Sequence, residues 1–202
     1  MTDESSIIFY FDFTSPYSYL ASERIDELAA KYGRKVQWRP VMLGAAFKVS
    51  GMPLLVTIPL KGEYSKRDFD RSARFMGIAY TFPPKFPVSS LSAARAYYWL
   101  HGQDCGKARE FAHIVFRAYW TEGRDISDTA VVLDIVRSQG LEVGACETAI
   151  GTQEIKDRVK NETDAAIAQG MFGAPYFMVD GEPFWGADRL PQIDKWLATG
   201  GF

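Results

Sequence analysis

The chain of 202 residues is 47% hydrophobic and 24% charged, and its formal net charge is -2. These values predict a globular protein of one domain, or of one domain with an insertion, which can bury a sizeable core. The small net charge argues against a nucleic-acid or anionic-membrane surface, and no apolar run approaches the ~20 residues of a membrane span.

The N-terminal residues and the cysteines indicate in which cellular compartment the protein works. Residues 1–6 are polar and acidic, without the basic and apolar regions of a secretory signal, so we expect no such signal. Cys105 and Cys146 lie far apart and form no motif, so we expect neither a disulfide framework nor a metal site. Both observations favour a reducing cytoplasm, where a small thiol cofactor would be plentiful.

The first element is a strand over residues 7–13, which are almost all apolar or aromatic. A helical pattern follows up to residue 31, and Gly33 is placed to end it. Ser15 is a natural N-cap, and Pro16 suits the first helical position. We therefore expect a serine hydroxyl at a helix N-terminus, a place whose free N–H groups and partial positive charge favour an anion.

The middle of the chain predicts helices. The alternating residues 36–41 indicate a second strand, parallel to the first because a helix connects the two. From about residue 43 to residue 168 strand patterns mostly vanish, and residues 51–62 are typical of a loop. Helices are expected over residues 65–76, from about residue 90, and over residues 105–120, 129–138, 143–150 and 153–169.

The strand pattern returns at residues 176–179, and Asp180-Gly181 is a strong hairpin signal before a returning strand at 182–185. Asp188 is expected to cap a last helix. The order β-α-β, helical insertion, β-β-α predicts an α/β, thioredoxin-like fold with a large all-helical insertion. We expect residues 1–44 and 169–202 to form the thioredoxin-like domain and residues 45–168 the inserted helical subdomain.

The first strand-to-helix junction is where thioredoxin-like proteins hold a Cys-X-X-Cys pair. Here both cysteine positions are serine, Ser15 and Ser18, and neither can form a mixed disulfide, which argues against a disulfide oxidoreductase. Resemblance to that superfamily also implies that Pro175 is cis and faces the start of the first helix. Its preceding residue, Ala174, would then offer a backbone N–H and C=O to an extended peptide.

Five segments, in order along nearly the whole chain, together resemble the 2-hydroxychromene-2-carboxylate isomerase family. That family is close to kappa-class glutathione transferases and to the DsbA-like fold. The segments are FDFTSPYSY at 11–19, WRP at 38–40 with LG at 43–44, FPP at 82–84 leading to Ser90, FGAPYF at 172–177 and WGADRL at 185–190.

The resemblance implies glutathione as the cofactor and a homodimer. Ser15 would hydrogen-bond the glutathione sulfur, and this donor together with the helix dipole would favour the thiolate. Ala174, beside Pro175, would pair with the cysteinyl unit, while Ala187 and Asp188 would hold the γ-glutamyl end and its ammonium group. The thiolate would add to an enone, a double bond conjugated to a ketone, and rotation and expulsion would give cis-trans isomerisation of a small aromatic catabolite.

Two departures from the family pattern concern the acceptor pocket. Met52 stands where the family often has an asparagine, and Phe47 stands near a substrate-binding lysine, with Lys48 one residue away. On a helix, one residue turns the side chain by about 100°. Lys48, Lys61, Met52 and Phe86 are candidate substrate contacts.

Structural roles and other functions compete with this interpretation. Ser15 could be only a helix cap, Asp188 only an N-cap, and Asp12 is expected to bond neighbouring backbone. The same thiolate could act on a different electrophile, as in a kappa-type glutathione transferase or peroxidase. A non-catalytic thioredoxin-fold binding module is the third alternative, and it predicts no measurable glutathione binding.

Overall fold

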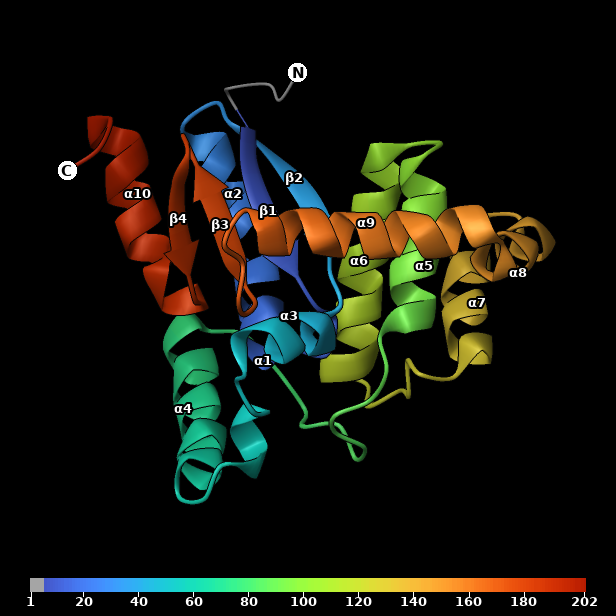
Figure 1. The fold of residues 1–202 in the computed structure, drawn as a ribbon, viewed down its shortest axis with the longest axis horizontal. Helices are drawn as coiled ribbons and strands as arrows, with labels where there is room; N and C mark the ends of the chain where they lie inside the picture. Colours follow the sequence, from blue (N-terminus) through green and yellow to red (C-terminus); the bar gives the residue numbers. More distant parts are fainter. Residues whose placement is uncertain (1–5) are drawn as a thin grey trace.

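Strand β1 (Ser6–Phe11) is an inner strand of a four-stranded sheet with the order β2-β1-β3-β4 (Figure 1). The structure is a computed structural model and describes residues 6–202. Residues 1–5 lie outside the described residues, and they belong to the segment in which we expect no secretory signal. β2 (Lys35–Pro40) is parallel to β1, whereas β3 (Tyr176–Val179) is antiparallel to β1 and to β4 (Glu182–Trp185). This order confirms the predicted β-α-β…β-β-α arrangement and the thioredoxin-like class.

Aromatic contacts fix the register of the sheet. Phe9 of β1 is fully buried and lies opposite Trp38 of β2 and Phe177 of β3. The ring centroid of Phe9 is 5.0 Å from that of Trp38 and 5.2 Å from that of Phe177. A slip of one residue would turn these rings away from the core, so the register is strongly specified.

This register brings two distant parts of the chain together. Tyr10 of β1 is opposite Tyr176 of β3, and the two strands are antiparallel. The chain leaving β1 toward Ser15 therefore meets the chain that enters β3 from Ala174.

The single helix expected after Ser15 is two helices, α1 (Pro16–Ser22) and α2 (Ile25–Lys31). At Arg24 the backbone leaves the helical conformation, with φ -132° and ψ -28°. Tertiary contacts hold the break: the Arg24 guanidinium donates to the Met76 carbonyl, and Glu23 is ion-paired with Arg117 at 3.0 Å. Because α1 has only seven residues, few peptide dipoles add up at its N-terminus, and the Ser15 hydroxyl becomes the more important group there.

The segment after β2 is more helical than expected. α3 (Leu43–Ser50) was not predicted, the predicted loop at 51–62 contains the 3-10 helix η1 (Leu55–Thr57), and α4 (Lys61–Met76) begins four residues before the predicted start. Gly51 and Gly77 end α3 and α4 with φ of 70° and 64°, a left-handed conformation that glycine adopts without strain.

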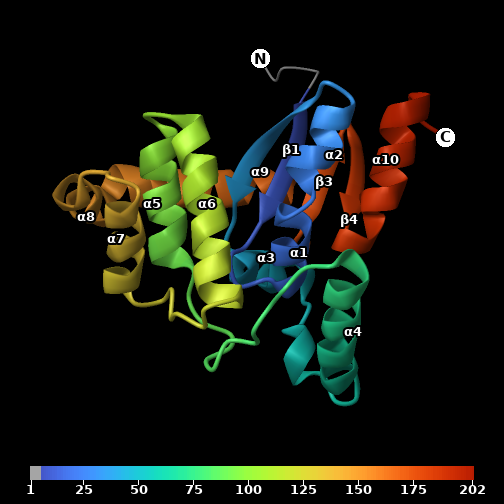
Figure 2. The same ribbon diagram turned by 180° about the vertical axis from the view of Figure 1, so that it is seen from behind.

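The remaining helices agree closely with the prediction. Their bounds are α5 (Leu91–His101), α6 (Cys105–Trp120), α7 (Thr129–Ser138), α8 (Val143–Gly151) and α9 (Gln153–Ala168). α9 crosses one face of the sheet, α1 and α2 lie on the other, and α5 to α8 gather beyond the β2 edge (Figures 1 and 2). α4 stands apart from that group, below the sheet in the same view. Since helices α3 to α9 lie between β2 and β3 in sequence, we retain the division at residues 44 and 169 as a proposal.

The predicted cap of the last helix is wrong. Residues around Asp188 form a 3-10 helix, η2 (Ala187–Arg189), and α10 (Leu190–Thr199) follows it. The N-cap position of α10 is Arg189, without a side-chain cap bond, and a proline stands in its first turn. Within residues 6–202, no helix is long and apolar enough to cross a membrane.

Candidate functional site

The hydroxyl of Ser15 links the two ends of the chain. Ser15 is 5% exposed, and its Oγ accepts a hydrogen bond from the Ser18 N–H at 3.2 Å, which confirms the N-cap. The same Oγ donates to the Ala174 carbonyl oxygen at 2.9 Å. The two groups that the sequence placed 159 positions apart are therefore in direct contact.

The loop before β3 has the expected conformation. The Ala174–Pro175 peptide bond is cis, and the Pro175 carbonyl accepts a hydrogen bond from the Gly186 N–H at 3.0 Å. Trp185 covers the loop: a Cβ on Gly173 would lie 2.6 Å from the indole Nε1, so only glycine allows this close approach. The loop is thus held between Ser15 on one side and the β4–η2 connection on the other.

Asp12 has the structural role expected of it. Its carboxylate is 4% exposed and accepts from the Thr14 N–H and hydroxyl, both at 2.9 Å. Its second oxygen accepts from the Leu43 N–H at 3.0 Å. Asp12 thereby fixes the turn before Ser15 to the first residue of α3.

Asp188 reaches the same region from η2. Gly186 has φ 107°, and a Cβ there would collide with the Asp188 Oδ1, so glycine is required for both the backbone and the placing of this carboxylate. The Asp188 side chain is 74% exposed, and its Oδ2 lies 3.6 Å from the Arg189 guanidinium. Ala187 is buried beneath it.

A cavity of about 680 Å³ unites most of the predicted site residues. Its lining includes Ser15, Ala174, Pro175, Asp188, Lys61, Met52 and Phe86. Two predicted residues do not line it: Ala187, which lies in the core beneath Asp188, and Lys48, which is exposed on α3. Phe47, one residue before Lys48, faces the cavity instead.

Sequence reasoning missed several lining residues. Tyr17 donates a hydrogen bond to Asp68 on α4 at 2.6 Å. Burial is the larger cause, and this hydrogen bond the next, that raises the pKa of the Tyr17 phenol. Tyr17 therefore stays a neutral donor that joins α1 to α4. Trp185, Gly186 and Arg189 stand in the quoted WGADRL motif, which was the available signal for them.

Residues 52–58, which include η1, form one wall of the cavity, and we call them the flap. Six of these seven residues line the cavity, Thr57 being the exception, and none of the seven is buried. The flap is seated on the first turn of α4, where the Gly62 N–H donates to the Ile58 carbonyl at 2.8 Å. A Cβ on Gly62 would lie 2.5 Å from the Val56 carbonyl oxygen, so this glycine lets the flap approach α4.

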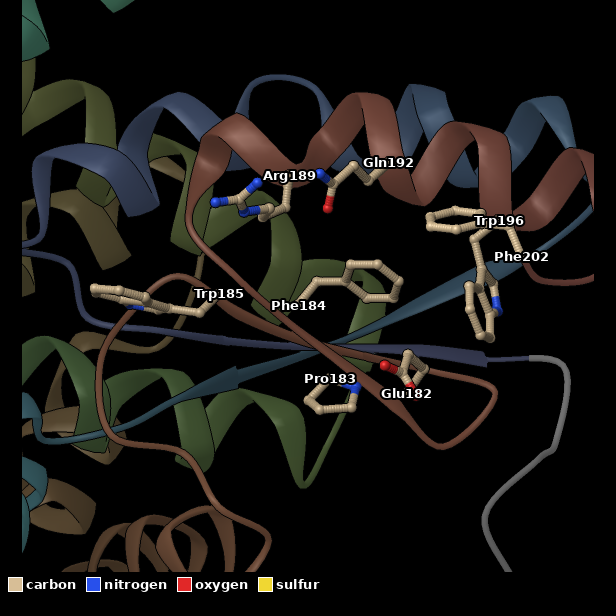
Figure 3. A pocket seen from close by; sticks show the side chains of 8 residues that line it. All are labelled: Glu182, Pro183, Phe184, Trp185, Arg189, Gln192, Trp196 and Phe202. Carbon is tan, nitrogen blue, oxygen red and sulfur yellow. The ribbon is translucent and has the colours of Figure 1, made fainter.

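A second hollow of about 330 Å³ lies between β4 and α10. Phe184 lies in its middle, with Trp196 and Phe202 at one end and Trp185 and Arg189 at the other (Figure 3). Trp185 and Arg189 line both hollows. The indole of Trp185 is therefore part of the wall that separates them.

The two cysteines have different environments, and neither lines the large cavity. Cys105 is exposed, whereas Cys146 is fully buried and burial raises the pKa of its thiol to about 11. We expect a chromogenic disulfide reagent to modify one thiol in the native protein and two after unfolding in guanidinium chloride, because the thiolate is the reactive form. Fast reaction of two thiols in the native protein would contradict this, and Cys105→Ser should abolish the native reaction.

Metal ligands do not gather in the part of the chain that the structure describes: no three His, Cys, Asp or Glu side chains there could hold a metal ion together. The polar chemistry of the large cavity rests on hydroxyls, backbone groups and the exposed charged side chains that line it.

Known proteins resemble this chain over most of its length. Residues 6–198 match the family model described as the DSBA-like thioredoxin domain. A 2-hydroxychromene-2-carboxylate isomerase of Pseudomonas putida is 30% identical over 189 residues, covering 93% of this chain and 91% of that protein. Glutathione S-transferase kappa 1 of Homo sapiens is 25% identical over 205 residues, covering 93% and 91%. A solved structure of 2-hydroxychromene-2-carboxylate isomerase matches with a TM-score of 0.87 and 28% identity, over 96% of this chain and 94% of that one.

Proposed function

Because the chain belongs to the DSBA-like thioredoxin family and to the 2-hydroxychromene-2-carboxylate isomerase family, we propose that it is a glutathione-dependent cis-trans isomerase of 2-hydroxychromene-2-carboxylate type in aromatic-compound catabolism. The observation that carries the proposal is the contact between Ser15 Oγ and the Ala174 carbonyl at the wall of the cavity. A kappa-type transferase or peroxidase is the second candidate, favoured by the kappa relatives, and it would use the same groups.

The residues present fit a cysteinyl peptide. The Ser15 hydroxyl donates its hydrogen bond to the Ala174 carbonyl. A ligand N–H that takes over the Ala174 carbonyl would release the Ser15 hydroxyl, which can then donate to a sulfur beside it. The exposed Asp188 carboxylate would meet an ammonium group, and the Lys61 ammonium, which forms no ion pair within residues 6–202, would meet a carboxylate.

Bound glutathione would supply a thiolate that bonds to one carbon of a conjugated double bond, allows rotation, and leaves unchanged with its electron pair. The chain's own task is to favour that thiolate and to exclude water. The Ser15 O–H favours a charged sulfur because a hydrogen bond to the charged form lowers the pKa of a thiol. Apolar side chains from the flap and α4 exclude water around the second substrate, which strengthens electrostatic interactions inside the cavity.

The test is a calorimetric titration of the protein with glutathione, followed by two assays. We expect saturable binding, isomerisation of the cis isomer of an aromatic enone, and little reaction with an aryl halide. Reaction with the halide alone would favour the transferase, and no measurable binding would favour the non-catalytic module.

Changing Asp188→Asn should weaken glutathione binding by about 1.5- to 5-fold, since exposed ion pairs contribute about 0.2–1 kcal/mol. Turnover at saturating glutathione should stay within about twofold, and the effect should shrink at high salt. Calorimetry at two salt concentrations measures it. Asp194→Asn is the control, because Asp194 pairs with Lys31 at 2.8 Å on a different surface. Equal weakening of glutathione binding by both variants would show that Asp188 does not contact glutathione.

We further propose a homodimer in the cytoplasm. Large apolar side chains that are exposed on the region of α3 and α4 support a contact with a second copy: Val49 at 71%, Leu60 at 91% and Phe75 at 89% exposure. Light scattering of the purified protein decides between monomer and dimer.

A further inference from the structure

Helix α3 begins without a cap of its own. Met42 holds the N-cap position in an extended conformation, with φ -93° and ψ 100°, but its side chain makes no cap hydrogen bond. The first turn carries no acidic residue, and only Ala46 of the eight helical residues is buried. A helix this short, with free N–H groups and little burial, depends on contacts from elsewhere to hold its start in place.

Asp12, directly after β1, supplies the missing cap. Its Oδ2 accepts from the Leu43 N–H, the first helical N–H of α3, at 3.0 Å, although the two residues are 31 positions apart. Its Oδ1 accepts from the N–H and the hydroxyl of Thr14, both at 2.9 Å. All three donors are neutral groups, so the carboxylate brings a negative charge to the end of α3 where the helix dipole favours one.

The two oxygens of this carboxylate hold two parts of the cavity wall together. Thr14 and Ser15 line the cavity, and the Ser15 N–H donates to the Asp12 carbonyl at 2.9 Å. Leu43 and Phe47 line it from α3, where residues four positions apart lie on one face of the helix. Asp12 is not among the described residues that line the cavity, so its effect on a ligand must pass through its neighbours.

We propose that Asp12 is a positioning residue for the second substrate: by capping α3 it holds Phe47 in the cavity wall, at a fixed place relative to the Ser15 turn. This inference rests on the function proposed above and adds the residue that sets the acceptor wall. Asparagine has one acceptor oxygen in place of two, so it can keep both bonds to Thr14 but leaves the Leu43 N–H without a partner. The bond to α3 therefore requires aspartate, whereas the local turn does not.

Asp12→Asn separates these two roles. KM for the aromatic enone should rise about tenfold or more, because a small displacement of a positioning wall is enough for such a loss. Glutathione affinity should stay within about twofold, and the pKa of the bound thiol should not rise, since the Ser15 turn is retained. In hydrogen-exchange mass spectrometry without ligands, the α3 amides should exchange about fivefold faster, as expected for a lost helix cap. A general loss of structure would instead weaken glutathione binding and speed exchange in the sheet.

A cap placed within α3 should restore what Asp12→Asn removes. Met42→Ser introduces a favoured N-cap side chain where the backbone is already extended. In a double-mutant cycle, the effect of Asp12→Asn on KM and on α3 exchange should be at least about threefold smaller in the Met42→Ser background. Where Asp12→Asn alone does not fold, the double variant should. Asp104→Asn is the matched control and should change neither quantity, because Asp104 caps α6 locally and asparagine caps equally well there.

Unchanged α3 exchange in Asp12→Asn would overturn the proposal, and so would an unchanged KM when α3 exchange has risen. A double variant that behaves no better than Asp12→Asn would also overturn it, since a cap at α3 would then not be the cause. If the wild type neither binds glutathione nor isomerises the enone, the proposed function is wrong. The affinity for benzylacetone, an aromatic ketone that cannot react, then replaces KM: a loss of about tenfold in Asp12→Asn supports the positioning role, and equal affinity or no binding to the wild type overturns it.

Discussion

Replacing Ser15 with alanine should lower glutathione-dependent kcat/KM by about 10²- to 10³-fold, the loss typical when one hydrogen-bond donor to a charged reacting atom is removed. The side chain is 5% exposed and its Oγ already lies against the Ala174 carbonyl. The other side-chain hydroxyls that line the cavity donate to other groups of the protein. The measurement is steady-state isomerisation, together with the ultraviolet absorbance of bound thiolate as a function of pH. Ser15→Ala should raise the pKa of the bound thiol.

Stability should change much less than activity in this variant. Loss of the hydrogen bond from the Ser18 N–H removes a helix cap worth about 1 kcal/mol, which corresponds to a melting-temperature decrease of roughly 2–4 °C in a chain of this size. Ser18→Ala is the matched control, because the Ser18 Oγ is buried without a hydrogen-bond partner among the described residues. That variant should retain activity and lose no stability. Full activity in Ser15→Ala would show that Ser15 is only a cap.

Gly62→Ala should raise KM for the second substrate by about tenfold or more while leaving glutathione affinity within about twofold. The new Cβ would stand 2.5 Å from the Val56 carbonyl oxygen and 2.9 Å from its carbonyl carbon. These are backbone atoms, so the flap itself must move, and overpacking of this kind costs typically about 1–3 kcal/mol. The flap supplies Met52, Leu55 and Val56 to the cavity wall, so the shift reaches the substrate.

The control for this variant is Gly44→Ala in the first turn of α3. A Cβ at Gly44 has nothing within 4 Å, and the residue follows Leu43, which lines the same cavity. Gly44→Ala should therefore keep both Michaelis constants and gain up to about 1 kcal/mol of stability from helix propensity. If Gly62→Ala also leaves the Michaelis constants unchanged, the flap does not shape the acceptor pocket.

Features with a strong local signal could be predicted from the sequence. Ser15-Pro16 carries an N-cap and an N1 proline, and helix α1 begins there. The helices at 105–120 and 129–138 were predicted with their observed bounds, and in the structure Asp104 and Asp128 cap them with side-chain hydrogen bonds. The expected cis bond before Pro175 came from resemblance to the thioredoxin superfamily, and the structure has it.

Features set by tertiary contacts could not be predicted. No glycine or proline marks the break at Arg24, which is held by the distant Met76 carbonyl and by the pairing of Glu23 with Arg117. Asp188 was expected to cap α10 because aspartate is a common N-cap, yet the chain forms η2 there and α10 starts after Arg189. The cap prediction failed because the η2 turn as a whole, and not the N-cap propensity of Asp188 alone, sets the conformation there.

The candidate site was predicted in part. Residues of the TSP, GAP and WGAD segments, all but Ala187, line one cavity. The register of β1 with β3 joins the first two segments, and the pairing of β3 with β4 adds the third. The orientation of α3 could not be derived from sequence, and it decides that Phe47 faces the cavity while Lys48 does not. The flap was predicted as part of a loop, because two prolines and two glycines interrupt residues 51–62.

The position of β1 between β2 and β3 has a consequence for synthesis of the protein. β1 ends at Phe11, and its antiparallel neighbour begins only at Tyr176. At ~5–20 residues per second, a ribosome needs roughly 10 to 30 s to translate the intervening chain. During that time one edge of an aromatic strand has no native partner, which is a hazard for aggregation. A lower growth temperature or a holdase chaperone should therefore improve the yield of the recombinant protein more than stabilising substitutions would.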